Sequence, residues 1–369
     1  MVSVRKTYKF RLYPTKAQET AMEQNLELCR IVYNKTLEAR KTAYEERGET
    51  LSKYALNNLL PRWKQETPEL RKVFSQTLQE VQERVDLAFK HFFRRVKNGE
   101  VPGYPRFKGK GWYDSFTYPQ MGFKLDGNKL YLSKVGDVRI KLHRPFTGNV
   151  KRVTITRSCD KWYASLTVES DNIQTISKSV NPAVGVDVGL AGFATLSNGI
   201  KIANPGFFRK EEKELARVQR KLSKIEKGEP ERRKTVKIVR KVHERISNKR
   251  HDFAHQLSRK LVSEYGFISF EDLDIRGMAR DSCLAKSIGD AAWRLLITAT
   301  RYKAVSAGTT VVLVNPACTS QLCSRCGQTV KKELKDRAHE CPCCGLVMDR
   351  DENAAVNILR LGLQSVAKA

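Results

Sequence analysis

Apolar and polar residues alternate along the start of the chain, VRKTYKFRLYP, in the manner of a β-strand that stops at Pro14. After Thr15, which can cap a helix, apolar residues recur mostly at steps of three and four. The residues with this spacing are Ala21, Met22, Leu26, Cys29, Val32, Tyr33 and Leu37. A second helical block runs from about residue 74 to 96. The pattern predicts a strand followed by a small helical unit.

Period-two alternation returns in FKLDGNKLYL, VRIKL and VTITRSCDKWYASLTVE, with turn signals at Asp126-Gly127 and near Cys159-Asp160. These segments predict an antiparallel sheet or a small barrel. The first strand could join this sheet and leave the helical unit as an insertion. Residues 99–118 combine Gly, Pro, basic and aromatic residues. They form either an exposed connection that touches phosphates and stacks bases or an ordinary loop with packed aromatics.

Two apolar runs joined by a Gly-containing turn, AVGVDVGLAGFATLSNG, open the second half of the chain. A further strand, within YGFISFEDLDI, ends its apolar run on Glu271. Between them, residues 209–250 hold 17 Lys or Arg against 7 Glu, with apolar residues at helical spacing and a break at residues 228–230. This segment predicts a helical pair with a strongly basic face.

The whole chain is also strongly basic. It has 369 residues, so two or more structural units are expected, and 68 Lys and Arg against 40 Asp and Glu give a net charge of +28. Such a charge repels itself unless a polyanion offsets it, which makes nucleic acid the natural partner. A heparin or membrane-surface binder is the alternative on charge alone. No apolar stretch approaches the roughly 18 residues of a membrane span, and the N-terminus lacks a signal peptide, so a cytoplasmic protein is expected.

Three carboxylates stand at unusual places in this pattern. Asp187 lies within an apolar run, where an unpaired charge is costly, Glu271 ends a core strand, and Asp349 and Asp351 stand just before a helix. Singly, each is more simply a helix cap or a solvated strand end. Together, Asp187, Glu271 and Asp351 are the set that could hold two Mg²⁺ ions roughly 4 Å apart for phosphodiester cleavage.

Two cysteine knuckles indicate a second metal site. Cys323 and Cys326 form the first and Cys341 and Cys344 the second, with 14 residues between them and a glycine after each. Four thiolates at this spacing suit tetrahedral Zn²⁺ and leave no open position, so the zinc is expected to be structural. Each glycine allows a tight turn that directs backbone donors at sulfur. Two nearby cysteines, Cys318 and Cys343, are interpreted as non-ligands.

These motifs, in this order, resemble the TnpB family of insertion-sequence proteins, the compact RNA-guided endonucleases related to type V CRISPR effectors. The resemblance rests on YKFRLYPTKAQ, VPGYPRFKG, GVDVGL, ANPGFFRK, RISNKRHDFAHQLS, FEDLDIRGM, SIGDAAW, TSQLCSRCG, CPCCG and DRDENAAVNIL. It implies an α/β plus β fold with an RNase H-like RuvC nuclease domain, an inserted zinc ribbon, and a preceding wedge β-barrel that contains a helical recognition insert.

The implied domains are a first wedge strand at 1–13, the helical insert at 14–110, the wedge barrel at 111–180, the first RuvC part at 181–314, a zinc ribbon that binds target nucleic acid at 315–346, and the second RuvC part with a C-terminal tail at 347–369. The resemblance also implies a transposon-derived guide RNA and a double-stranded DNA target beside a short adjacent motif. The implied Mg²⁺ ligands are the same Asp187, Glu271 and Asp351, with Asp349 in support.

Six residues are candidates for nucleic-acid binding by the same resemblance. Gln79, Thr117 and Tyr118 would read the adjacent motif, since a Gln amide can pair with adenine. The other three lie in the basic pair: Arg209, Lys210 and Arg250.

Three other functions remain open on the sequence: a guide-directed repressor that no longer cuts, a transposase that joins DNA ends, and a plain RNA-binding protein. A repressor is expected to lose some of the acids, and all three are present.

Overall fold

The structure is a computed structural model that describes residues 4–170, 181–278, 280, 285–333 and 336–367. It divides into two compact units, residues 1–173 and 174–369, each with its own elements and core. None of the described helices is long and apolar enough to cross a membrane.

A seven-stranded antiparallel sheet forms the first unit, in the order β2-β6-β7-β1-β5-β4-β3. Its strands are β1 (Val4–Tyr13), β2 (Ser115–Tyr118), β3 (Phe123–Asp126), β4 (Lys129–Leu132), β5 (Gly136–Lys141), β6 (Asn149–Ser158) and β7 (Lys161–Ser170). The first strand pairs with β7 and β5 at the centre of the sheet, as predicted. In the described residues β2 and β3 are free edges, so the sheet is a half-barrel. Of the two predicted forms, an antiparallel sheet or a small barrel, the open sheet is the one observed.

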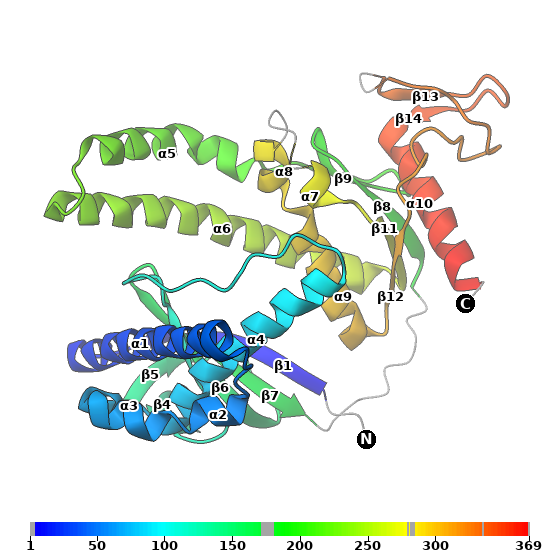
Figure 1. The fold of residues 1–369 in the computed structure, drawn as a ribbon. Coiled ribbons are helices and arrows are strands. Elements are labelled where there is room, and N and C mark those ends of the chain that lie inside the picture. The colour runs from blue at the N-terminus through cyan, green and yellow to red at the C-terminus, as the bar shows by residue number, and fades with distance from the viewer. Residues whose placement is uncertain (1–3, 171–180, 279, 281–284, 334–335, 368–369) are drawn as a thin grey trace. The chain divides into compact units, whose positions relative to one another are not determined.

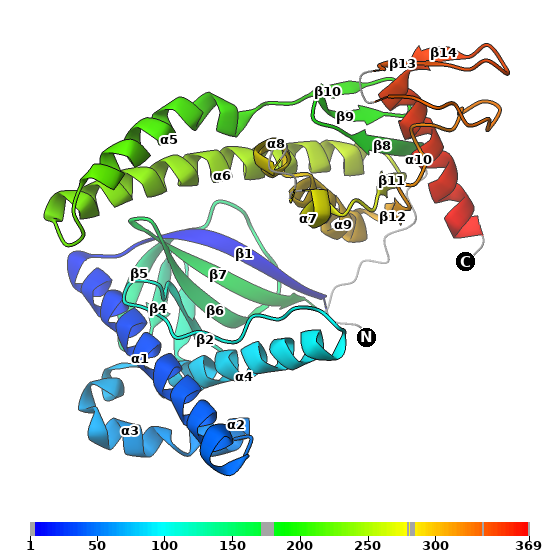
Figure 2. The ribbon, with the colours of Figure 1, turned by 45° about the horizontal axis from the view of Figure 1, so that its top comes forward.

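The helices of this unit are inserted between β1 and β2, and Figure 2 shows them beside the sheet. They are α1 (Lys16–Arg47), α2 (Lys53–Asn57), α3 (Leu60–Glu66), the 3₁₀ helix η1 (Pro68–Lys72) and α4 (Ser75–Lys97). The cap predicted at Thr15 is present, because its side chain accepts from the backbone of Gln18 and the Gln18 side chain accepts in return. Helices and sheet share one core, in which Met22 and Cys29 of α1 lie with Phe10 and Phe116.

A five-stranded mixed sheet forms the second unit, in the order β10-β9-β8-β11-β12. Its strands are β8 (Ala183–Val188), β9 (Gly192–Leu196), β10 (Lys201–Ala203), β11 (Phe267–Glu271) and β12 (Thr310–Val314). Strands β8, β11 and β12 are parallel, β9 pairs antiparallel with β8, and β10 pairs antiparallel with β9. The apolar runs predicted as strands therefore pair around β8.

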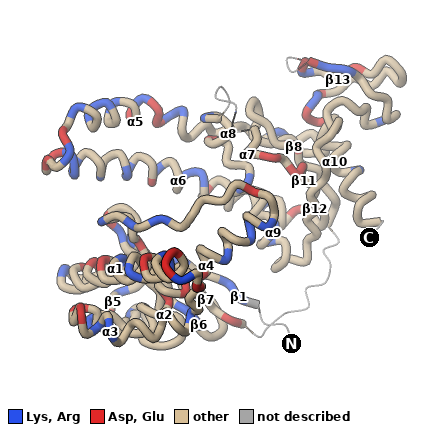
Figure 3. Tube along the Cα trace, in the orientation of Figure 1, with Lys and Arg blue, Asp and Glu red and all other residues tan. Residues whose placement is uncertain are grey.

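Six helices are described in this unit: α5 (Phe207–Lys224), α6 (Pro230–Glu264), α7 (Ile275–Met278), α8 (Ala285–Ala291), α9 (Trp293–Ala307) and α10 (Arg350–Ala367). The predicted basic helical pair is confirmed as α5 and α6, which lie side by side with Gly228 in their connection. Figure 3 shows Lys and Arg along both helices.

A small two-stranded ribbon, β13 (Ala338–Glu340) with β14 (Val347–Asp349), precedes α10. Because β14 pairs through Asp349, the ribbon hairpin extends past residue 346 and leads directly into the helix. The paired strand therefore ends two residues before the third candidate carboxylate, Asp351.

Helix α10 packs against β8 and β11, and a glycine sets how closely it approaches. A Cβ atom placed on Gly185 of β8 would lie 2.0 Å from the backbone oxygen of Ala355. On the neighbouring strand, Ser269 Oγ donates to the backbone oxygen of Ile358 at 3.0 Å. The helix thus makes backbone contact with the sheet, which only a residue without a side chain allows at Gly185.

Substitution Gly185→Ala is expected to destabilise the second unit, because the new methyl group must push α10 off the sheet. Overpacking of this kind costs about 1–3 kcal/mol, and each kcal/mol lowers the Tm of a unit of this size by roughly 2–4 °C. The matched control is Gly289→Ala in α8, where an added Cβ meets no heavy atom within 4 Å. A thermal scan that shows equal Tm values for the two variants would contradict this account of the contact.

Candidate functional site

Asp187 lies near the end of β8, opposite Thr195 of β9 and two residues beyond the glycine that α10 contacts. Residues two apart on a strand point to the same face, so its carboxylate is on the side covered by α10. Burial raises the pKa of Asp187 well above its usual value, and the negative charges of Glu271 and Asp351 raise it further. Both of the other acids predicted from the sequence are therefore close enough to Asp187 to oppose its ionisation.

Glu271 ends β11, the parallel neighbour of β8, and its side chain is only 8% exposed. Because Phe270 is paired with Val186, Glu271 and Asp187 are the next residues along adjacent strands. Burial raises the pKa of Glu271, and a hydrogen bond from the hydroxyl of Thr319 partly offsets that effect. Two carboxylates thus meet at the carboxyl ends of neighbouring parallel strands.

Asp351 belongs to the first turn of α10, one helical turn before the residue that contacts Gly185. Asp349 holds that turn in place: its Oδ1 accepts from the backbone N–H groups of Asp351 at 2.9 Å and Glu352 at 3.2 Å. Its Oδ2 accepts from Lys201 Nζ at 2.6 Å. Although burial opposes it, these bonds bring the pKa of Asp349 below its usual value. Asp349 therefore caps the helix that carries Asp351.

Oxygen donors alone make up this acidic site, which suits Mg²⁺ better than a softer metal. The charges of Glu271 and Asp351 add to the cost of ionising Asp187, and a bound cation would offset that cost. Among the described residues, however, only the four ribbon cysteines place candidate ligand atoms all within 4.8 Å of one another. The three acids are thus gathered in one place without being closed around a single point, which is compatible with a site for more than one ion.

The four predicted cysteine ligands do converge. Cys323 Sγ lies 3.6 Å from Cys344 Sγ, and Cys326 Sγ lies 3.5 Å from Cys341 Sγ. A tetrahedral Zn²⁺ with Zn–S bonds of about 2.3 Å requires sulfur separations of roughly 3.8 Å, so the donor set fits zinc. Cys318 and Cys343 are exposed and outside the cluster, as predicted.

Each knuckle turns at its glycine with a positive φ, 78° at Gly327 and 67° at Gly345. The turns direct backbone N–H groups at the sulfurs, as the sequence predicted. Although burial opposes it, N–H donors from residues 325 and 326 and the side chain of His339 lower the pKa of Cys323 to about 5. His339 is fully buried. Its Nε2 forms no hydrogen bond to a nitrogen or oxygen atom of the described residues, and its Nδ1 contacts Lys332 Nζ. These hydrogen bonds therefore favour the thiolate form of Cys323.

The candidate readers of an adjacent DNA motif do not share one surface. Gln79 is exposed on α4. Thr117 and Tyr118 are only 2% and 1% exposed, with Thr117 Oγ1 accepting from Arg84 Nη2 at 2.8 Å and the Tyr118 hydroxyl donating to the backbone oxygen of Ser133 at 2.8 Å. The expectation that Thr117 and Tyr118 touch bases is therefore not supported, because both side chains are enclosed and already bonded within the first unit.

The candidates in the basic pair also differ. Arg209 and Lys210 are exposed at the start of α5, although Arg209 is paired with Glu212 at 2.9 Å. Arg250 on α6 is 24% exposed and forms an ion pair with Asp290 at 2.9 Å. The same carboxylate accepts from the backbone N–H of Phe208 at 2.8 Å, so it caps α5 and ties it to α6. Arg250 thus has a structural partner that the sequence analysis did not identify.

Three residues that sequence reasoning missed act through partners distant in the chain: Arg84, Asp290 and Thr319. Each stands in an ordinary polar context, and Asp290 and Thr319 fall within motifs, SIGDAAW and TSQLCSRCG, that served only for the family resemblance. No local pattern shows that Asp290 and Thr319 become buried or that Arg84 binds Thr117.

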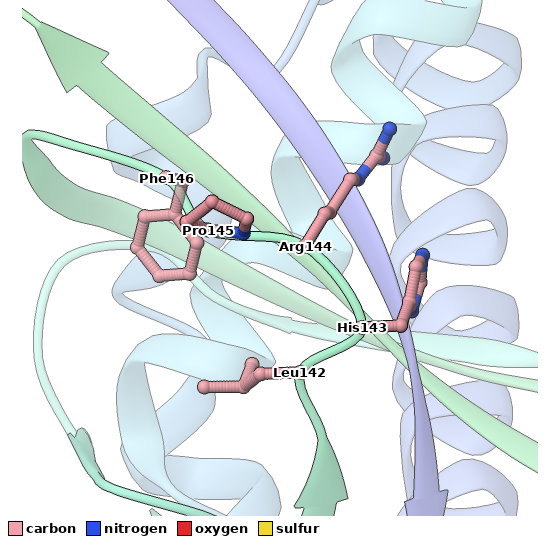
Figure 4. Close-up of a pocket in the computed structure, with 5 residues that line it drawn as sticks. All are labelled: Leu142, His143, Arg144, Pro145 and Phe146. Carbon is pink, nitrogen blue, oxygen red and sulfur yellow. The ribbon is translucent and has the colours of Figure 1, made fainter.

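A cavity of about 480 Å³ in the first unit is lined by consecutive residues of the loop between β5 and β6, from Leu142 to Phe146. In Figure 4 Leu142 and Phe146 lie on one side of that loop and His143 and Arg144 on the other. The cavity contains none of the carboxylates or cysteines described above, so it does not add to the candidate site.

The second unit thus combines carboxylates at the strand ends of a mixed sheet with a four-cysteine ribbon ahead of α10. Three family descriptions match the chain: "Probable transposase" (OrfB of IS605) at residues 165–281, "Cas12f1-like, TNB domain" at 293–358, and "Helix-turn-helix domain" at 1–49. Within the described part of the last range the structure has one strand and one long helix.

Two relatives match the chain over nearly its full length. A protein of Streptomyces pristinaespiralis, named "Putative RNA-guided DNA endonuclease", is 36% identical over 100% of this chain and 92% of its own. A protein of Escherichia coli K12 with the same description, InsQ, is 35% identical over 96% of this chain and 92% of its own. The chain belongs to the TnpB (OrfB) family of IS605-type insertion sequences.

Among solved structures, the chain is similar to CasPhi-2 (Cas12j) bound to crRNA, with 9% identity, a TM-score of 0.47, and 98% of each chain covered.

Substitution Asp187→Asn is expected to stabilise the protein in Mg²⁺-free buffer at pH 7. The raised pKa means that ionising Asp187 costs more free energy in the folded protein than in the unfolded chain. This free-energy cost lowers the stability of the fold at pH values above the unfolded-state pKa of about 3.9. Below pH 4 both states are protonated, so the gain should disappear there. The check is Tm against pH for the wild type and the variant, with exposed Asp126→Asn as control; a Tm gain that persists unchanged below pH 4 would contradict this electrostatic cause.

The purified protein is expected to contain one zinc per chain, which Cys344→Ser should remove. The adjacent substitution Cys343→Ser should keep it, because that thiol lies outside the cluster. Elemental analysis of the two variants measures this directly. Full zinc occupancy in Cys344→Ser, or loss of zinc in Cys343→Ser, would show that the ligand set is wrong.

Proposed function

We propose that this chain is an RNA-guided DNA endonuclease that cleaves double-stranded DNA by metal-assisted phosphodiester hydrolysis at one RuvC-like site. The observation that carries the proposal is the convergence of Asp187, Glu271 and Asp351, which come from β8, β11 and α10 and influence one another electrostatically. An acidic centre of this kind in a chain of net charge +28 suits a polyanionic substrate.

The relatives support guide RNA and DNA as the partners. The Streptomyces pristinaespiralis and Escherichia coli relatives are both described as a "Putative RNA-guided DNA endonuclease", and the match spans 92% of each. In RNA-guided systems base pairing supplies the sequence information, and the protein reads backbone shape and a short adjacent motif. Exposed Gln79 stays a candidate for contact with that motif.

The acids would act as ligands for two Mg²⁺ ions, which together supply an activated water and stabilise the leaving oxygen. The residues of the chain set the geometry for this chemistry. The strand ends fix Asp187 and Glu271 side by side, and the cap at Asp349 fixes the backbone of Asp351. In addition, Lys201 neutralises Asp349, so a fourth negative charge is offset next to the site.

Two other parts of the second unit support the binding of nucleic acid. Basic residues along α5 and α6 form a surface suited to phosphates, whose contacts supply affinity without sequence specificity. The ribbon at residues 315–346 would keep a structural zinc and contribute to binding of the target. The half-barrel and its helices correspond, in this proposal, to the wedge and recognition parts over residues 1–180.

Substitution Asp187→Ala is expected to abolish cleavage of a motif-bearing DNA duplex in the presence of Mg²⁺ and to leave binding of guide RNA and DNA intact. The carboxylate is a metal ligand in the proposal and does not contact the guide. The measurement compares cleavage and equilibrium binding for the protein purified with its own guide RNA.

The exposed residue Asp126 at the end of β3 provides a control, since Asp126→Ala removes the same charge far from any of the three acids in sequence and in another unit. It should cleave as the wild type does. Undiminished cleavage by Asp187→Ala would refute the assignment of the site. Absence of cleavage by the wild type with its guide would refute the proposed activity itself.

A further inference from the structure

A buried hydroxyl is bonded directly to one of the candidate metal ligands. Thr319 Oγ1 lies 2.5 Å from Glu271 Oε1, and the two residues are 3% and 8% exposed. A backbone oxygen, that of Pro316, lies at 3.2 Å from the same hydroxyl. Because a hydroxyl has only one proton, it donates that proton to the closer and charged acceptor, Glu271 Oε1. Thr319 therefore donates to Glu271.

This hydrogen bond gives the two carboxylate oxygens of Glu271 different roles. With Oε1 engaged by Thr319, the carboxylate plane of Glu271 is fixed and Oε2 remains for a metal ion. A side chain at the end of a strand can otherwise rotate about its terminal bond, since that torsion is broad. Partners that orient a ligand in this way are a regular feature of metal sites, and their removal typically costs 10–100-fold in metal affinity or activity.

Thr319 is itself held by the helix that carries Asp351. The side chain of Asn357 donates from Nδ2 to the backbone oxygen of Thr319 at 2.9 Å and to that of Leu322 at 2.7 Å. One turn earlier, Asn353 Nδ2 also donates to Leu322 O, at 2.7 Å. Both asparagines are fully buried. The segment from Thr319 to Leu322 is thus clamped onto α10.

The same clamp reaches the first cysteine knuckle. The backbone N–H of Ser324, next to Cys323, donates to Asn353 Oδ1 at 2.9 Å. A continuous series of bonds therefore runs from the ribbon, through Asn353 and Asn357, to Thr319 and then to Glu271. The helix at the centre of this series also bears Asp351, so the second and third acids are positioned from one element.

We propose that Thr319 is a positioning residue for Glu271: its hydroxyl orients the carboxylate toward the metal ions, and the asparagines of α10 couple that orientation to the ribbon. The inference rests on the proposed nuclease function, because it assigns a role in the same site. It goes beyond that function in giving the ribbon a part in the geometry of the acids.

The test uses two variants of the full-length protein with its guide RNA. Thr319→Val keeps the shape of the side chain and removes the donor, whereas Thr319→Ser keeps the donor and removes the methyl group. Thr319→Val is expected to lower the cleavage rate and to weaken Mn²⁺ binding, measured by electron paramagnetic resonance, by about 10–100-fold. Equilibrium binding of DNA and zinc content should not change. Thr319→Ser should retain most of the wild-type values.

The outcomes are separable. If the wild type cleaves and Thr319→Val matches it in rate and Mn²⁺ affinity, the inference is wrong and the proposed function stands. If Thr319→Ser is as impaired as Thr319→Val, the residue acts through packing and the inference is again wrong. If Thr319→Val loses zinc or unfolds, Thr319→Ala replaces it in the same comparison with Thr319→Ser. If the wild type does not cleave, the proposed function fails, and the Mn²⁺ affinities alone decide the inference.

Discussion

The close approach of α10 to β8 at Gly185 is the constraint on which the candidate site depends. A side chain at that position would hold the helix away from the strand, and Asp351 would move with it. The acid on the strand lies two residues beyond the contact, and the acid on the helix lies one turn before it. One missing Cβ therefore brings together two carboxylates that are separated by most of the second unit in sequence, while pairing of β11 with β8 adds Glu271.

Gathering these acids costs free energy, as the raised pKa of Asp187 shows. Such a cluster is maintained because the surrounding contacts fix it: the cap by Asp349, the ion pair of Asp349 with Lys201, and the hydrogen bond from Thr319. A group of like charges without a cation destabilises the fold that contains it. Groups of this kind, with strongly shifted pKa values, are typical of functional sites. The electrostatic cost of the site is the physical basis for expecting it to bind cations.

The zinc ribbon has a place in this arrangement that its isolated motif does not reveal. It lies between the second and third acids in sequence, and β14 leads directly into α10. Its first knuckle is bonded to Asn353, and the segment before it is bonded to Asn357. The ribbon is therefore anchored on the same helix that contributes to the acidic site. In the basic helical pair, Asp290 likewise anchors one element on another, because it caps α5 and binds Arg250 of α6.

The sequence by itself determined the features that depend on local patterns. Period-two alternation predicted the strands, Thr15 predicted the start of α1, and the paired knuckles predicted the four cysteines that converge in one cluster. The sequence also singled out the three acids as candidates, because each breaks an apolar pattern or begins a helix. Tertiary structure decided what depends on distant partners: that Thr117 and Tyr118 are enclosed, that Arg250 is bound by Asp290, and that Thr319 reaches Glu271. A hydroxyl or carboxylate looks the same in the sequence whether it faces solvent or a buried partner, and only the packing of α10 and the sheets distinguishes them.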